Sequence, residues 1–227
     1  MNFGTHERWS GPVSDALEPL PLRASTSRFE GRIWSVRTDE IAVGEAIVER
    51  DIVIHPGAVV VIALDDLDRV LLIRQYRHPV GALLFEPPAG LLDVAGESTL
   101  TSAKRELAEE AGYAAKTWNV LVDFFNSPGG SSEAIRVYLA RDLHRLPEGR
   151  HVTGEAEEAW LPQVWVDLEQ AKNLILAGSL GNPGAIVGVL AALAARTDSW
   201  VHLRAADAPW AAREHLLRND RVQLGGE

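Results

Sequence analysis

The sequence predicts an α+β protein in which a mixed sheet lies between helices, preceded by a small antiparallel β segment. Strand-like stretches, with alternating or continuous apolar residues, fill most of residues 29–86 and return at 119–140. Helical patterns lie at 100–111, 168–177 and 183–196. Runs of strands interrupted by single helices favour a layered fold, with helices packed on a central sheet.

The two ends of the chain are expected to be less regular. Residues 1–25 contain five glycines and prolines and are predicted to form an irregular lead. Residues 197–227 form a C-terminal tail. Trp200 and Trp210 predict that parts of this tail pack against the body.

A small N-terminal β domain is predicted for residues 26–56. Alternating β-branched residues favour three strands in it, at 32–37, 40–43 and 46–54. Turn-forming residues separate these stretches.

Residues 57–196 are expected to form the main domain. Its first strand is the apolar run Ala58–Leu64, which is typical of a buried strand. Arg69–Tyr76 follows a turn and is predicted to pair back on that strand as a hairpin. Leu83–Glu86 is a short strand that leads into Pro-Pro-Ala-Gly at 87–90.

The second half of this domain alternates strands with helices. Three further strands are predicted, at 119–126, 134–140 and 163–166. Asp167 is the expected N-cap of the helix that follows it. Pro183 suits the first turn of the last apolar helix.

Composition excludes several classes of function. The 227 residues carry a formal net charge of −10, which disfavours a groove that binds nucleic acid. The chain has no cysteine, so thiol chemistry and disulfides are excluded. Residues 1–15 lack the apolar core of a secretory signal, and the longest apolar run, 185–195, is too short to span a bilayer. We therefore expect a cytoplasmic protein that binds neither membrane nor nucleic acid.

Residues 90–113 carry the strongest functional signal. Glu106, Glu109 and Glu110 fall within five positions of one predicted helix, behind a glycine-rich turn. On an α-helix, Glu106 and Glu110 would lie only about 40° apart. The residues expected to face the core form the opposite stripe: Leu100, Ala103, Leu107 and Ala111. Because like charges at this spacing repel, a bound cation best explains the cluster, and Mg²⁺ accepts carboxylate, water and phosphate oxygens together.

This segment resembles the Nudix box. The box consists of a glycine, five residues, a glutamate, seven residues, and then Arg-Glu-apolar-any-Glu-Glu-any-Gly-apolar. Gly90, Glu97 and the run 105–113 supply every fixed position. The visible departure is that six residues separate Gly90 from Glu97, and the extra one falls in the loop 93–96. The resemblance covers residues 57–196 and implies the Nudix fold, a mixed sheet between helices.

The resemblance also implies a metal site and metal-activated attack of water on phosphorus. Four positions match the ligands: the backbone carbonyl of Ala89 and the carboxylates of Glu106, Glu109 and Glu110. Glu106 and Glu110 match the principal, catalytic pair. Mg²⁺ is the expected cofactor, with Mn²⁺ able to substitute. Arg105 is expected to orient the glutamates, and Glu97 to do the same or to reach the metal through water.

Three features narrow the resemblance to Nudix enzymes that hydrolyse ADP-ribose to AMP and ribose 5-phosphate. Pro128 stands fifteen residues beyond the end of the box. The sequence Gln-Tyr-Arg at 75–77 and the lead-in at 85–90 match motifs of these members. The strands of 26–56 resemble a domain that such members exchange across a homodimer.

The loop at 127–133 matches these members only in part. They often have a side chain near Gly130 and an acidic residue near Ser132. Five residues are candidates for binding the nucleotide substrate: Trp34, Arg77, Glu86, Pro128 and Glu133. Arg77 could equally cap its hairpin, Glu86 could hold its loop, and Trp34 could be a buried core residue instead of stacking on adenine across the dimer.

The water also needs a general base, which in these members is often a glutamate on a loop outside the box. Glu158 is the first candidate and Glu157 the second, on an acidic loop before the strand at 163–166. The alternative is that this loop is simply a solvated acidic segment.

Three other functions remain open. The same chemistry could act on NADH, a nucleotide sugar or a dinucleotide polyphosphate. A Nudix-like sensor would bind ADP-ribose without turnover, although such modules usually lose the box glutamates. RNA decapping fits the acidic charge poorly, since the chain lacks a basic stripe.

Overall fold

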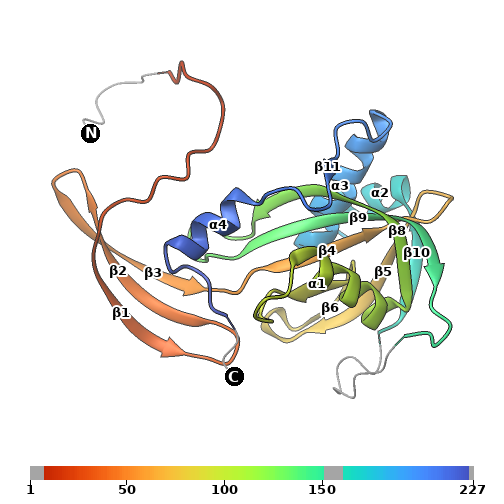
Figure 1. The fold of residues 1–227 in the computed structure, drawn as a ribbon, viewed down its shortest axis with the longest axis horizontal. Helices are drawn as coiled ribbons and strands as arrows, with labels where there is room; N and C mark the ends of the chain where they lie inside the picture. Colours follow the sequence, from red (N-terminus) through yellow and green to blue (C-terminus); the bar gives the residue numbers. More distant parts are fainter. Residues whose placement is uncertain (1–7, 151–160, 225–227) are drawn as a thin grey trace.

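The computed structural model describes residues 8–150 and 161–224, and within these ranges it contains three sheets. The N-terminal sheet is antiparallel in the order β1-β2-β3 and projects from the rest of the molecule (Figure 1). Its strands are β1 (Leu22–Glu30), β2 (Ser35–Val43) and β3 (Ala46–Ile54).

Two predictions for this sheet were wrong. The first strand begins at Leu22, inside the expected irregular lead, and 32–37 and 40–43 contribute to one continuous strand, β2. The sequence of β1, Leu-Arg-Ala-Ser-Thr-Ser-Arg-Phe-Glu, has no apolar alternation, and every residue of it is exposed. Pairing with β2, not a buried face, makes this segment a strand.

The central sheet has five strands in the order β11-β8-β9-β4-β7. They are β4 (Ala58–Ala63), β7 (Ala89–Leu91), β8 (Tyr113–Phe125), β9 (Ala134–Arg145) and β11 (Arg204–Ala205). β4 pairs parallel with β9, whereas the other pairs are antiparallel. The prediction of a mixed sheet is therefore confirmed.

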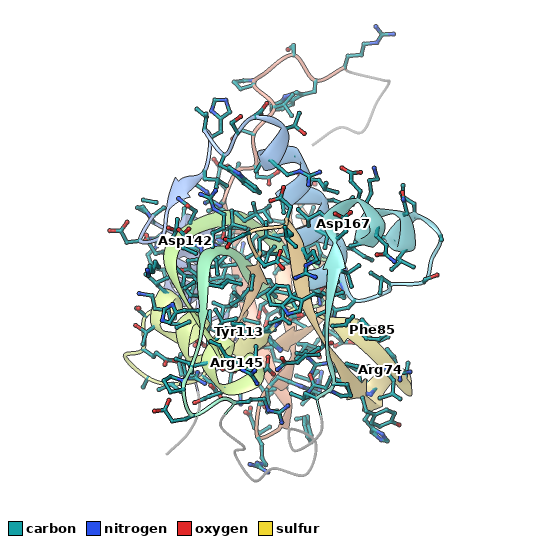
Figure 2. The ribbon with its side chains drawn as sticks, turned by 90° about the vertical axis from the view of Figure 1, so that its right-hand side faces the viewer. Arg74, Phe85, Tyr113, Asp142, Arg145 and Asp167 are labelled. Carbon is teal, nitrogen blue, oxygen red and sulfur yellow. The ribbon has the colours of Figure 1, made fainter. Side chains whose placement is uncertain are left out.

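A second three-stranded sheet places β5 (Arg69–Arg77) between β10 (Gln163–Asp167) and β6 (Ala82–Glu86). The predicted hairpin of β4 with β5 was wrong, because the two strands belong to different sheets and are joined at the bridge of Leu64 with Val70. Figure 2 shows Arg74 and Phe85 side by side on β5 and β6, with the guanidinium 5.5 Å from the ring centroid. Tyr113 of β8 packs edge-on against Trp165 of β10, which joins the two sheets.

Helices cover both faces of the central sheet (Figure 1). They are α1 (Thr99–Glu106), α2 (Leu168–Leu176), α3 (Pro183–Thr197) and α4 (Ala211–Arg218). Alternate residues of β4 point to opposite sides: Val60 and Ile62 pack in the cluster that contains α2 and α3, whereas Val59 and Val61 pack in the one that contains α1. This is the predicted sandwich of helix, sheet and helix. No helix in the described ranges is long and apolar enough to cross a membrane.

The predicted helix starts are confirmed. The Asp167 carboxylate accepts hydrogen bonds from the amides of Glu169 and Gln170, at 2.9 and 3.1 Å, and so caps α2. Asn182 caps α3 in the same way, through a 3.0 Å bond from the amide of Ala185. Pro183 then occupies the first turn.

The box helix differs from the α-helix that the sequence predicts. It is α-helical only to Glu106, and the five residues Leu107–Ala111 form a π-helical turn. Gly112 ends it in the left-handed region, at φ 73°. A π-helix is wider than an α-helix, so the angular spacing expected for Glu109 and Glu110 does not apply. Such turns occur frequently at functional sites.

The tail packs against the body, as Trp200 and Trp210 predict. β11 pairs with β8, and the side chain of Trp210, only 6% exposed, joins the cluster under α4. Arg136 of β9, 2% exposed, donates to the carbonyls of Ala208 and Pro209 at 2.7 and 3.1 Å. The tail is thus part of the core of the protein.

Candidate functional site

The three box glutamates lie at the junction of α1 with the π-helical turn. Leu107 and Ala111 are buried beneath them against the central sheet, as the sequence predicts. This packing fixes the helix on its apolar side, and the carboxylates of Glu106 and Glu110 lie against the strand β7. β7 carries Ala89 and Gly90, which pair with Val60 and Val59 of β4.

Glu110 is the most deeply placed of these carboxylates. It is 8% exposed, and its Oε2 accepts a 2.9 Å hydrogen bond from the amide of Ala89. The pKa of Glu110 is raised to about 8, mainly by burial, with the charges of Glu106 and Glu86 adding to the rise and the Ala89 amide and Arg77 opposing it. Glu106, Glu86 and Arg77 therefore lie close enough to Glu110 to affect its pKa.

Arg105 connects the other box carboxylates. Its Nε and Nη2 each donate to Glu97 at 3.0 Å, one to each carboxylate oxygen, in the bidentate geometry that suits a guanidinium. Its Nη1 donates to Glu106 at 2.6 Å and to Glu109 at 3.0 Å. These bonds lower the pKa of Glu97 and raise that of Arg105. Arg105 thus holds the other three carboxylates together.

Gly90 allows Glu106 to reach this position. A β-carbon on residue 90 would overlap the carboxylate of Glu106. Glycine is therefore required here for close approach of a side chain, not for an unusual backbone angle.

Arg77 and Glu86 form a second polar group beside Glu110. The Nε of Arg77 donates to Oε2 of Glu86 at 3.1 Å, and its Nη2 donates to Oε1. Asn182 donates to the same carboxylate at 2.8 Å. Because Glu86 is 1% exposed and both its oxygens are bonded, the geometry favours its role in holding Arg77 and the loop over direct contact with a sugar hydroxyl.

The remaining candidates for substrate binding lie apart from the carboxylates. Pro128 lines a cavity of about 860 Å³ between the N-terminal sheet, α4 and the loop at 127–132, and the box glutamates do not line it. Glu133 accepts a 2.7 Å bond from Asn126 and lies 3.7 Å from His55. Trp34 is 42% exposed in the loop between β1 and β2, so the alternative of a buried core tryptophan was wrong.

Glu157 and Glu158, the candidates for the general base, lie outside the described residues. Two residues that the sequence analysis missed support the site from a distance. Asn182 is a helix cap that also holds Glu86. The side chain of Gln163 donates to the carbonyls of Glu110 and Ala111 at 3.2 and 3.1 Å, and so satisfies the end of the π-helical turn. The contacts of Asn182 with Glu86 and of Gln163 with Glu110 and Ala111 are long-range, and the local sequence gives no signal for them.

The donor set fits a hard divalent cation. It consists of carboxylate and carbonyl oxygens, and a cation would neutralise the Glu110 carboxylate, whose pKa is raised first by burial and then by the charges of Glu106 and Glu86. In the part of the chain that the structure describes, no three acidic or histidine side chains already stand as a closed metal cluster. Glu106 and Glu109 are instead paired with Arg105.

Comparison with known proteins agrees with this geometry. Residues 54–183 match the model of the NUDIX domain. The ADP-ribose pyrophosphatase of Mycobacterium tuberculosis is 42% identical over 203 residues, which cover 88% of this chain and 95% of that protein. The ADP-ribose pyrophosphatase of Bacillus subtilis is 36% identical over 149 residues, 65% of this chain and 78% of its own.

A solved structure titled as that of an ADP compounds hydrolase shares the fold. It superposes with a TM-score of 0.67 at 22% identity, covering 82% of this chain and 98% of its own. The match of the domain model spans more than half of the chain and includes Gly90, Arg105 and the three glutamates. The chain therefore belongs to the Nudix family.

Proposed function

We propose that this protein hydrolyses the diphosphate of ADP-ribose to AMP and ribose 5-phosphate, in a reaction that requires Mg²⁺. The observation that carries the proposal is the buried carboxylate of Glu110 beside Glu106, under the strand of Ala89 and Gly90. It stands in a Nudix domain whose relatives include ADP-ribose pyrophosphatases. An uncompensated buried carboxylate is costly, and a site for a divalent cation accounts for it.

The residues that would hold Mg²⁺ are Ala89, Glu106, Glu109 and Glu110, with Mn²⁺ able to replace it. When bound, the cation supplies charge neutralisation for the diphosphate and lowers the pKa of a coordinated water. Arg105 and Glu97 hold the carboxylates in register through the bonds described above.

The substrate would be held by Arg77 beside the carboxylates and by groups that lie apart from them. Arg77, with its orientation fixed by Glu86, supplies positive charge for a phosphate. Trp34 offers an exposed ring for stacking on adenine. Pro128 and Glu133 lie on the loop before β9, where the second ribose would bind.

Glu158, or else Glu157, would accept the proton from the attacking water. This assignment rests on the family resemblance. We expect Glu158→Gln to lower kcat by about 10²- to 10⁴-fold. If Glu157→Gln, Glu158→Gln and the double variant all keep the wild-type kcat, neither residue is the base.

The test of the function is phosphorus NMR of products formed with Mg²⁺ from a substrate panel. The panel contains ADP-ribose, NADH, GDP-mannose, UDP-glucose and diadenosine polyphosphates, and it is run for the wild type and for Glu110→Gln. AMP and ribose 5-phosphate from ADP-ribose, abolished in the variant, would support the proposal. Bound ADP-ribose without turnover in the presence of Mg²⁺ would make the protein a sensor and contradict it.

A second candidate is hydrolysis of another nucleoside diphosphate derivative by the same carboxylates. The loop that carries Pro128 favours keeping it, since a β-carbon at Gly129 or Gly130 would meet nothing within 4 Å. No atom of the described residues therefore fills the space directly beside these two glycines. Faster turnover of NADH or a nucleotide sugar in the panel would establish this alternative.

We further propose that the protein is a cytoplasmic homodimer that binds neither nucleic acid nor membrane. The N-terminal sheet supports the dimer, because β1 is exposed along its whole length and unpaired sheet edges favour association. The acidic net charge supports the exclusion of nucleic acid. A monomer mass in light scattering at micromolar concentration would contradict the dimer.

A further inference from the structure

One side chain of α4, that of Arg213, reaches the ends of the paired strands β4 and β7. Arg213 donates from Nη1 to the carbonyl of Pro56 at 2.6 Å and from Nη2 to the carbonyl of Leu92 at 3.3 Å. Pro56 precedes β4, and Leu92 follows β7. One guanidinium from the C-terminal tail therefore joins two segments that lie more than a hundred residues before it.

These two carbonyls stand at the end of the ladder that positions the site. β4 and β7 pair at Ala58 with Leu91, and the amide of Leu92 donates to the carbonyl of Gly57 at 3.0 Å. Arg213 binds the residues just beyond these pairs, Pro56 before β4 and Leu92 after β7. The same short ladder holds Ala89, whose amide binds Glu110, and Gly90, which lies against Glu106.

The guanidinium of Arg213 lies in a space that a side chain at position 57 would fill. Gly57 has φ +83°, and a β-carbon there would come within 2.8 Å of Nη1 of Arg213 and 3.0 Å of the carbonyl of Ala134. The guanidinium also lies 6.0 Å from the ring of Trp210. Glycine at position 57 thus leaves room for the cation.

The choice of partners distinguishes this arginine from a surface ion pair. Within residues 8–150 and 161–224 no carboxylate forms a salt bridge with Arg213, and burial alone lowers its pKa. A bonded carboxylate on a side chain could move with the arginine. The carbonyls of Pro56 and Leu92 belong to the main chain and cannot move in this way. The two donors of the guanidinium therefore fix the distance between Pro56 and Leu92.

We propose that Arg213 is a positioning residue for catalysis, which holds β7 on β4 and thereby sets Ala89 and Gly90 against the carboxylates of the box. The proposal rests on the proposed function for its kinetic consequence, but not for its structural one. Arg213 touches neither metal nor substrate. It acts through Leu92 and the β4–β7 ladder.

The test compares three variants of the full-length protein. Arg213→Met keeps the apolar stem and removes both hydrogen bonds, and Arg213→Lys retains a cation that can serve one carbonyl at a time. Arg204→Met is the matched control, since it removes an ion pair of the same tail with Asp123, on β8 and away from the box. Each is measured by hydrogen–deuterium exchange of residues 88–93, by thermal unfolding, and by kcat and KM for ADP-ribose.

We expect Arg213→Met to increase exchange selectively over residues 88–93 and to lower kcat by about tenfold or more, with KM changed less. Arg213→Lys should lie between it and the wild type, and it serves as the test if the methionine variant does not fold. Arg204→Met should leave both exchange at 88–93 and kcat within about twofold of the wild type.

Unchanged protection of residues 88–93 in both Arg213 variants would overturn the proposal. So would a rise in exchange that is equal in Arg213→Met and Arg204→Met, because it would mean that the tail only stabilises the fold. If the wild type turns over none of the substrate panel, the proposed function fails, but the exchange measurement still decides whether Arg213 positions β7.

Discussion

The α-carbon of Gly90 lies so close to the carboxylate of Glu106 that no β-carbon fits between them. The contact joins the first fixed residue of the box to its first helical glutamate, across the space between β7 and α1. Because the obstructing atoms are the flexible end of a side chain, a larger residue at position 90 would displace the carboxylate before it displaced the strand.

We expect Gly90→Ala to lower kcat by on the order of 10²-fold, since displacing a catalytic group by about 1 Å has costs of this size. The melting temperature should change little, because the central sheet need not move. Steady-state kinetics and thermal unfolding check both parts. Gly181→Ala is the control, as a β-carbon there meets nothing within 4 Å. A large fall in melting temperature with a normal kcat in the remaining folded protein would contradict the prediction.

The buried carboxyl of Glu110 should make the metal-free protein sensitive to pH. Its pKa is raised from 4.5 to about 8, so the protonated form is favoured in the folded state. The contribution of the Glu110 proton to the free energy of unfolding is complete below about pH 4.5 and is lost as the pH rises through about 8. In EDTA, we therefore expect Glu110→Gln to gain stability relative to the wild type between pH 5 and pH 8, measured by thermal unfolding. Glu45→Gln, an exposed substitution, should show no such trend.

The same protonation competes with a cation. Since a carboxylate must lose its proton to bind metal, Mg²⁺ should raise the melting temperature of the wild type more at pH 8 than at pH 6. Glu110→Gln should largely lose this pH-dependent increment. An equal Mg²⁺ effect at both pH values would show that Glu110 does not bind the metal.

Replacing Arg105 by lysine should show that the several donors of the guanidinium, and not only its positive charge, are needed to hold the carboxylates. Lysine cannot bind both oxygens of Glu97 while also reaching Glu106 and Glu109. We expect Arg105→Lys to lower kcat or metal affinity by about 10- to 100-fold, measured by titrating activity with Mg²⁺. Lys104→Ala, at the exposed neighbouring position, should behave as the wild type. Full activity of Arg105→Lys at wild-type Mg²⁺ levels would reject this role of the guanidinium.

Asn182 has two tasks that substitution can separate. Asn182→Ser keeps a side-chain oxygen to cap α3 but removes the amide that donates to Glu86, whereas Asn182→Ala removes both interactions. Urea unfolding should show a further loss of about 1 kcal/mol for alanine relative to serine, the usual worth of such a cap. Both variants should raise the KM for ADP-ribose alike if Glu86 orients Arg77. A KM unaffected by either substitution would separate Asn182 from substrate binding.

The features that the sequence predicted well are those set by neighbouring residues. Asp167 and Pro183 lie at the starts of their helices, so each helix start is visible in a few consecutive positions. The buried strand β4 is a continuous apolar run, and the stripe from Ala103 to Ala111 is set by helical spacing. The box pattern likewise brought the metal-ligand candidates together on one short segment.

The features that the sequence did not predict depend on distant partners or on an altered helix. β1 becomes a strand only by pairing with β2. The choice of β9 over β5 as the neighbour of β4 is made between two strands that each contain a buried apolar stretch. The π-helical turn breaks the spacing from which angles are inferred. Contacts such as that of Arg213 with Leu92 arise only when the tail has returned to the body.

The buried side chain of Arg136 on β9 obtains all its hydrogen-bond partners only late in the synthesis of the chain. Arg136 leaves the ribosome long before its two carbonyl acceptors, which follow it by 72 and 73 residues. Until then its charge has Asp123 as a partner but not the main-chain groups that complete its burial, and β8 lacks the edge strand β11. The central sheet therefore gains its last strand, and Arg136 its last partners, only when residues 204–209 have been made. A fragment that stops after Thr197 would contain every box glutamate, yet it would lack the two carbonyls that complete the burial of Arg136, so we expect it to be less stable than the full chain.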